Sequence, residues 1–208
     1  MMNARLKFAC TVLLFVLSNC IAAQKFDAGF QVGLNTSQIT GDDLVGYNKP
    51  GITAGIWVKR QFANPKLSAW MEISYLPKGS KKNLRPSDSI PSLYKLHLNY
   101  IEVPLTVNYR LIPKLSLETG LSCGFYISNT EEDEFGDLSG IYSPREQFAR
   151  TDISFNAGAN WHLSEKWMFN VRVANSIFPV RKHDQVTYFR LNRGQYSSCV
   201  MGRFFYTF

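Results

Sequence analysis

Residues 115–128 read LSLETGLSCGFYIS, and this stretch decides the fold. Leu115, Leu117, Leu121, Phe125 and Ile127 all occupy odd positions, whereas small and polar residues dominate the even positions. A period of two places these sets on opposite faces of a β-strand. The stretch is longer than a soluble strand of about 5–6 residues and long enough for a tilted membrane strand, which needs about 9–11.

The same alternation recurs about eight times along the chain, over 26–35, 52–59, 67–75, 101–110, 115–128, 153–163, 167–174 and 198–208. The polar faces are rich in Gly, Ser, Asn, Glu and Arg, residue types that suit the narrow interior of a small membrane barrel whose apolar face meets lipid. A lipocalin-like barrel or a β-sandwich also alternates, but it turns its apolar face inward. The composition of the polar face therefore favours the membrane barrel.

The connections between these runs alternate in length. Short links at 63–66, 112–114 and 164–166 separate long ones at 40–50, 77–95, 129–147 and 179–197. Outer-membrane barrels combine short periplasmic turns with long outer loops. The sequence therefore predicts an all-β fold, a closed antiparallel up-and-down transmembrane β-barrel of about eight strands with both termini on the periplasmic side.

The amino-terminal residues predict export. Arg5 and Lys7 precede an apolar run over 8–17, and Ala22-Ala23 offers a cleavage site, the pattern of a signal peptide. We expect a signal peptide over 1–23 and one outer-membrane barrel domain over 24–208, in a Gram-negative bacterium. A lipoprotein site at Cys20 is the alternative for this end of the chain.

The net charge indicates which partners the mature chain can meet, and the cysteine positions indicate whether it forms a disulfide. The formal net charge of +7 falls to +5 without the two basic residues of the signal peptide. An exported chain rarely meets nucleic acid, so we expect this charge to meet outer-membrane lipid and lipopolysaccharide phosphates instead. Two cysteines remain, Cys123 and Cys199, on strands that should not be neighbours, and we expect both to be free thiols.

Four segments resemble a known family. Tyr100–Leu105, Ile73–Gly79, Val171–Val173 and Arg203–Phe208 are similar in order and spacing to segments of the PorT-like outer-membrane β-barrel family of Bacteroidetes-type bacteria. This resemblance covers nearly the whole mature chain. It implies a component of the envelope or of protein secretion, with an envelope protein as partner.

The carboxyl-terminal residues Phe204, Tyr206 and Phe208 alternate and end the chain on an aromatic ring. This pattern resembles the signal that the barrel-assembly machinery reads, so we expect that machinery to be a partner. Six aromatic residues toward strand ends predict interfacial girdles, with core packing as the alternative; they are Trp57, Tyr75, Tyr109, Trp161, Trp167 and Tyr206.

The interior of an eight-stranded barrel is just wide enough for its own side chains. Inward charges then need partners, because an unpaired buried charge costs several kcal/mol. We predict an ion network in the lumen that argues against an open pore, formed by Glu72, Glu102, Glu118, Arg172 and Arg203. Within the fourth run, Pro104 and the change of phase between Leu98 and Ile101 predict a β-bulge.

The sequence contains no nucleotide, cofactor or zinc motif, so we expect neither a cofactor nor a metal. His162 and Ser164 are spaced like the base and nucleophile of lipid A deacylases, but they fall at a predicted periplasmic turn, away from the outer leaflet. We therefore expect no enzymatic activity, with a lipid-modifying enzyme or a small pore as alternatives. Two charged clusters are expected in solvated outer loops, one basic at 78–85 and one acidic at 131–137.

Overall fold

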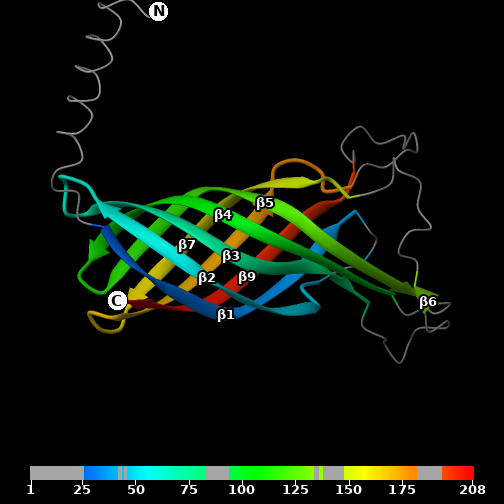
Figure 1. The fold of residues 1–208 in the computed structure, drawn as a ribbon, viewed down its shortest axis with the longest axis horizontal. Coiled ribbons are helices and arrows are strands. Elements are labelled where there is room, and N and C mark those ends of the chain that lie inside the picture. The colour runs from blue at the N-terminus through cyan, green and yellow to red at the C-terminus, as the bar shows by residue number, and fades with distance from the viewer. Residues whose placement is uncertain are drawn as a thin grey trace, which may run out of the picture.

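The computed structural model describes residues 26–41, 44, 46–82, 94–133, 136–137, 148–181 and 194–208. Eight long antiparallel strands form a tilted barrel (Figure 1). Sequence neighbours pair throughout, β1 pairs with β9, and β4 pairs with β5, which closes the ring. This confirms the predicted closed barrel of eight strands. The predicted signal peptide lies outside the described residues.

The strands are longer than the sequence pattern suggested, because the outer ends continue into the predicted loops. The long strands are β1 (Phe26–Thr40), β2 (Lys49–Gln61), β3 (Leu67–Lys81), β4 (Tyr94–Ile112), β5 (Leu115–Asp133), β7 (Thr151–His162), β8 (Trp167–Ser176) and β9 (Tyr196–Thr207). A two-residue strand, β6 (Gly136–Asp137), pairs with the end of β5. In Figure 1 the β2–β3, β4–β5 and β7–β8 turns lie at the same end of the barrel as the carboxyl terminus.

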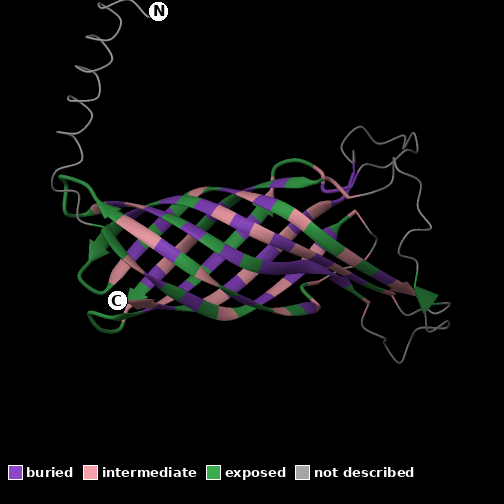
Figure 2. Cartoon of the chain, in the orientation of Figure 1, coloured by how far each residue is buried: buried purple, intermediate pink, exposed green. Residues whose placement is uncertain are grey.

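Burial alternates along most of each long strand, visible as bands in Figure 2, and only the outer part of β3, over 76–80, is buried without a break. On β5, Leu117 and Leu121 are exposed, while Glu118 and Ser122, the residues that follow them, are buried. This is the reverse of a soluble protein, in which the apolar set is buried. It is the arrangement of a barrel whose outside meets lipid. No helix in the described ranges has the length and apolarity to cross a membrane.

The polarity inverts at the outer end of the barrel. Leu96, Leu98 and Tyr100 point inward on β4 and pack with Ile39 and Val180, whereas the outward neighbours of this β4 segment, such as Lys95, are polar. Water replaces lipid outside this part of the wall, so burying apolar residues inside becomes favourable. The change in the apolar pattern of the sequence after Leu98 therefore reflects the change from water to lipid outside the barrel. The side chains of β4 themselves alternate strictly between the inside and the outside of the wall through this segment.

Two details of the sequence interpretation need correction. The irregularity in the β4–β5 ladder falls between Asn99 and Tyr100, within the predicted interval from Leu98 to Ile101, but Pro104 is not its site and pairs in register with Ser122. Trp57 points into the barrel and is buried, so it is not part of a girdle. The other expected girdle residues are at least partly exposed on the outside of the wall.

Candidate functional site

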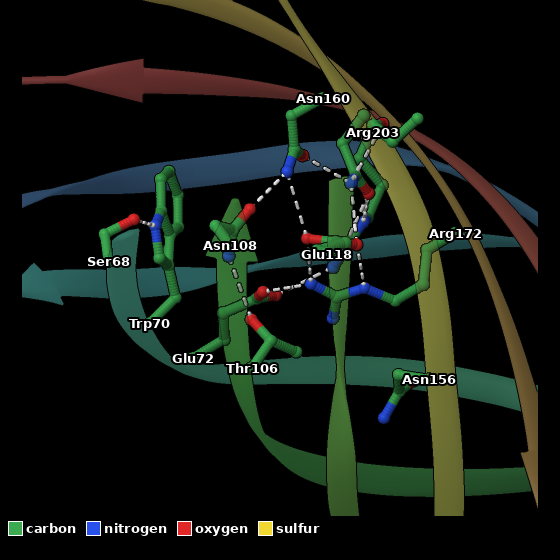
Figure 3. Close-up of polar contacts among 12 residues, drawn as sticks. Ser68, Trp70, Glu72, Thr106, Asn108, Glu118, Asn156, Asn160, Arg172 and Arg203 are labelled. Atoms are coloured by element: carbon green, nitrogen blue, oxygen red, sulfur yellow. Dashed lines mark hydrogen bonds and ion pairs between the residues drawn. The ribbon is translucent and has the colours of Figure 1, made fainter. Parts of the chain in front are cut away.

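The centre of the lumen holds a network of two arginines and two glutamates, each almost completely buried. Arg172 on β8 donates to Glu118 on β5 at 2.6 Å and to Glu72 on β3 at 2.6 Å. Arg203 on β9 donates to the other oxygen of Glu72 at 2.8 Å. Figure 3 shows these side chains converging inside the barrel. The network therefore cross-links strands from opposite sides of the wall.

Asparagines complete the hydrogen bonds of the network. Asn170 donates to Glu118 at 2.8 Å and accepts from Arg203 at 3.0 Å, and Asn160 donates to Glu118 and to Asn108. Saturating the remaining hydrogen-bond capacity in this way is what makes buried charges tolerable. The glycine at position 158 leaves room for the Glu118 carboxylate, since a Cβ on Gly158 would lie 2.7 Å from a Glu118 oxygen.

Glu102 does not join this network. It lies nearer the outer end, where Lys78 on β3 bridges it to Asp152 on β7, with a Lys78–Asp152 distance of 2.8 Å. All three side chains are buried. The structure thus brings four of the five predicted lumen residues together and places the fifth in a second ion cluster. The sequence interpretation missed Lys78 because it assigned this residue to a solvated loop.

The acidic cluster also contributes to the interior. Glu131 is buried and forms an ion pair with Arg181 at 2.7 Å, while Glu132 stays on the surface and pairs with Lys95. The prediction of solvated loops was therefore wrong for Lys78 and Glu131. Arg85 and Glu134, from the same two clusters, lie outside the described residues.

Apolar layers separate the charged ones. Trp57, Trp70, Met168 and Phe205 form a buried cluster on the periplasmic side of the arginine network. A second apolar cluster, of Leu76, Ala174, Cys199 and Met201, follows the network along the same strands. The lumen is therefore filled by alternating layers of paired charges and close-packed apolar side chains. Cys123 and Cys199 are both free thiols.

The proposed base and nucleophile are not paired with each other. The Ser164 hydroxyl accepts hydrogen bonds from the backbone N–H groups of Lys166 and Trp167, which makes it a cap of the β7–β8 turn. His162 Nε2 instead lies 3.1 Å from the Ser116 hydroxyl. The described residues hold no group of three or more His, Cys, Asp or Glu side chains placed to bind a metal ion.

The carboxyl-terminal aromatics lie on the outer surface at the β1–β9 seam. Phe208 is 77% exposed, and its ring contacts those of Tyr206 and Phe30 at centroid distances of 6.3 Å. Tyr206 stacks on Phe30, and Phe204 packs against Phe169. The final residue therefore contributes little to interior packing and remains accessible at the periplasmic end of the last strand.

Solved structures of two other proteins share this architecture. Ail, the attachment invasion locus protein of Yersinia pestis, is 13% identical with a TM-score of 0.50, and the match covers 88% of this chain and 99% of Ail. Neisserial surface protein A is 12% identical with a TM-score of 0.52, over 89% of this chain and 99% of that protein. At this identity the likeness concerns the fold.

No curated protein matches the chain in sequence. A family model does match, and it covers residues 22–181, which is most of the chain. The model describes the outer membrane protein β-barrel domain, and the lipid-facing wall and closed ring described above agree with it. The chain therefore belongs to the family of outer membrane proteins with this β-barrel domain and resides in the outer membrane of a Gram-negative bacterium.

Proposed function

We propose that the protein is a non-enzymatic, non-conducting component of the outer membrane that acts by binding an envelope partner at its periplasmic rim or its outer loops. The observation that carries this proposal is the filled lumen. Arg172, Arg203, Glu72 and Glu102 are each no more than 2% exposed. Charges so completely buried and paired leave no continuous water path, and eight strands enclose too little space for one beside them.

The absence of enzymatic activity is part of the same proposal. Its support is the placement of the two residues that the sequence offered as a catalytic pair. Because the Ser164 hydroxyl caps a turn and His162 contacts Ser116, neither is positioned to activate the other. A nucleophile and its base need to be within hydrogen-bond reach.

Features of the surface support two proposed partners. Lys81 and Lys95 pair in register at the outer ends of β3 and β4, and both are exposed. We propose that they meet phosphates of lipopolysaccharide, whose negative charge favours clustered lysines. We further propose that the barrel-assembly machinery reads Phe204, Tyr206 and Phe208, because the last of these rings is accessible at the strand end.

The resemblance to the PorT-like family gives the finer proposal, a role in protein secretion or envelope assembly. Its support is the order of the four matching segments, which fall in turn on β3, β4, β8 and β9. A closed barrel suits such a role, because it anchors an assembly in the membrane without opening the envelope.

Planar-bilayer recording tests the closed lumen. We expect the purified barrel to produce no conductance above that of the lipid alone, because paired charges and apolar layers occupy its interior. Arg203→Ala serves as the comparison, since it shortens one side chain of the central network. Discrete current steps in the unmodified protein, with a size that changes in Arg203→Ala, would assign a pore to the lumen and contradict the proposal.

A further inference from the structure

The periplasmic end of the barrel contains space that the described side chains do not fill. A cavity of about 520 Å³ lies there, bounded by the buried aromatic cluster on one side and by the periplasmic turns on the other. Ligand sites in proteins have volumes of about 300–1,000 Å³. The cavity is therefore large enough for one or two side chains of a partner.

Aromatic rings form the floor of this cavity. Trp57 and Trp70 stack with ring centroids 4.7 Å apart, and Phe205 packs against both. Each indole N–H is already used, by the Phe30 carbonyl and the Ser68 hydroxyl respectively. The floor therefore offers apolar contact without free hydrogen-bond donors, and it favours an apolar group over a sugar, whose hydroxyls need polar partners.

Positive charge dominates the rim. Four cationic side chains line the cavity, Lys59, Arg110, Lys114 and Lys166, against two carboxylates, Asp27 and Glu165. Lys59 pairs with Asp27 at 2.5 Å. Arg110 and Lys114 have no carboxylate partner within the part of the chain that the structure describes. They contrast with the lumen arginines, whose carboxylate partners lie within 3 Å.

We propose that this cavity binds an acidic peptide segment of a periplasmic protein, with one aromatic or aliphatic side chain on the tryptophan floor and carboxylates at Arg110 and Lys114. The inference rests on the proposed binding function and names its site and the chemistry of its partner. Both halves of the cavity are needed. The apolar floor supplies contact area for the peptide. The unpaired cations favour a negatively charged peptide and increase the rate at which it associates.

Calorimetry on the detergent-solubilised barrel tests this inference. The probe is a pentapeptide with acetylated and amidated ends, in which one phenylalanine is flanked by two aspartates on each side. Two matched peptides replace the aspartates with asparagines or the phenylalanine with serine. The test variant is Arg110→Glu with Lys114→Glu, and the control is Arg150→Glu, an exposed arginine just before the start of β7 at the opposite end.

We expect saturable binding of the acidic peptide, weaker by about tenfold or more for either matched peptide and for the test variant. Arg150→Glu should bind the acidic peptide as the unmodified protein does. Because Arg110 and Lys114 are exposed, the test variant should fold. A circular dichroism spectrum and a heat-dependent gel shift like those of the unmodified barrel establish that it does.

Four results would overturn the inference: no saturable binding, equal binding of the asparagine peptide, equal binding of the serine peptide, or equal binding by the test variant. Bilayer recordings on the same preparation separate this failure from failure of the proposed function. If the barrel does not conduct and does not bind the peptide, the proposed cavity site is wrong but the proposal of a closed lumen stands. A conducting barrel contradicts the function itself.

Discussion

Replacing Arg172 with methionine is expected to destabilise the barrel by about 3–5 kcal/mol, because two buried carboxylates lose the cation that they share. Arg172 is 1% exposed and contacts Glu72 and Glu118 at 2.6 Å each. Methionine keeps most of the side-chain length, so the change is mainly one of charge. The free energy of unfolding in urea, with the barrel folded into phospholipid vesicles, measures the effect.

Arg60→Met is the matched control, since Arg60 is exposed at the end of β2, and we expect a change within about 0.5 kcal/mol. Adding Glu118→Gln to Arg172→Met should recover part of the loss, because Glu118 is the carboxylate that loses its ion pair, whereas Glu72 keeps Arg203. A loss below about 1 kcal/mol in Arg172→Met, with no recovery in the double variant, would contradict the paired network.

Lys78→Met is expected to cost a similar amount, again about 3–5 kcal/mol, because it leaves Glu102 and Asp152 facing each other in the interior. The two ion clusters share no partner, so the losses in Lys78→Met and Arg172→Met should add within about 0.5 kcal/mol. Arg172 and Arg203 share Glu72, and their losses should not add. The same urea unfolding measures the single variants and both double variants, and strong coupling between Lys78 and Arg172 would mean that the two clusters act as one.

The barrel architecture was predictable because it depends on the two-residue alternation of apolar and polar side chains along each strand. Alternation over residues 115–128 identified β5, and the sorting of short and long links identified the two ends of the barrel. Charges on the polar faces had to lie inside, and a closed interior had to pair them. That reasoning reached Glu72, Glu118, Arg172 and Arg203 without the structure.

The outer third of the barrel was not predictable by the same rule, because the rule assumes lipid outside. Above the membrane the wall faces water, and Leu96 and Leu98 turn inward where the sequence suggested a slip. Strand β3 continues to Lys81, which carries Lys78 into the lumen as the partner of Glu102. The sequence did contain a sign of this change, because Leu96, Leu98 and Tyr100 are apolar and lie on the same face of β4 as Glu102.

The periplasmic cavity was also beyond the sequence. Trp57 and Trp70 fall on the polar face of their strands, which does place them inside. Their stacking depends on the register between β2 and β3, where Trp57 pairs with Glu72 and Lys59 with Trp70. Alternation within one strand fixes which way a side chain points, but it does not fix which residues of the neighbouring strand lie opposite.

The accessibility of a spin label at Leu121 tests the lipid-facing wall most directly. In a background with Cys123→Ala and Cys199→Ala, a nitroxide on Leu121→Cys in a phospholipid bilayer should collide more with oxygen dissolved in lipid than with a water-soluble nickel chelate. Leu121 is 51% exposed in the middle of β5, so its label has to meet whatever surrounds the barrel. A label that collides more with the nickel chelate would mean that water surrounds the wall, and the arrangement with lipid outside and charge inside would be wrong.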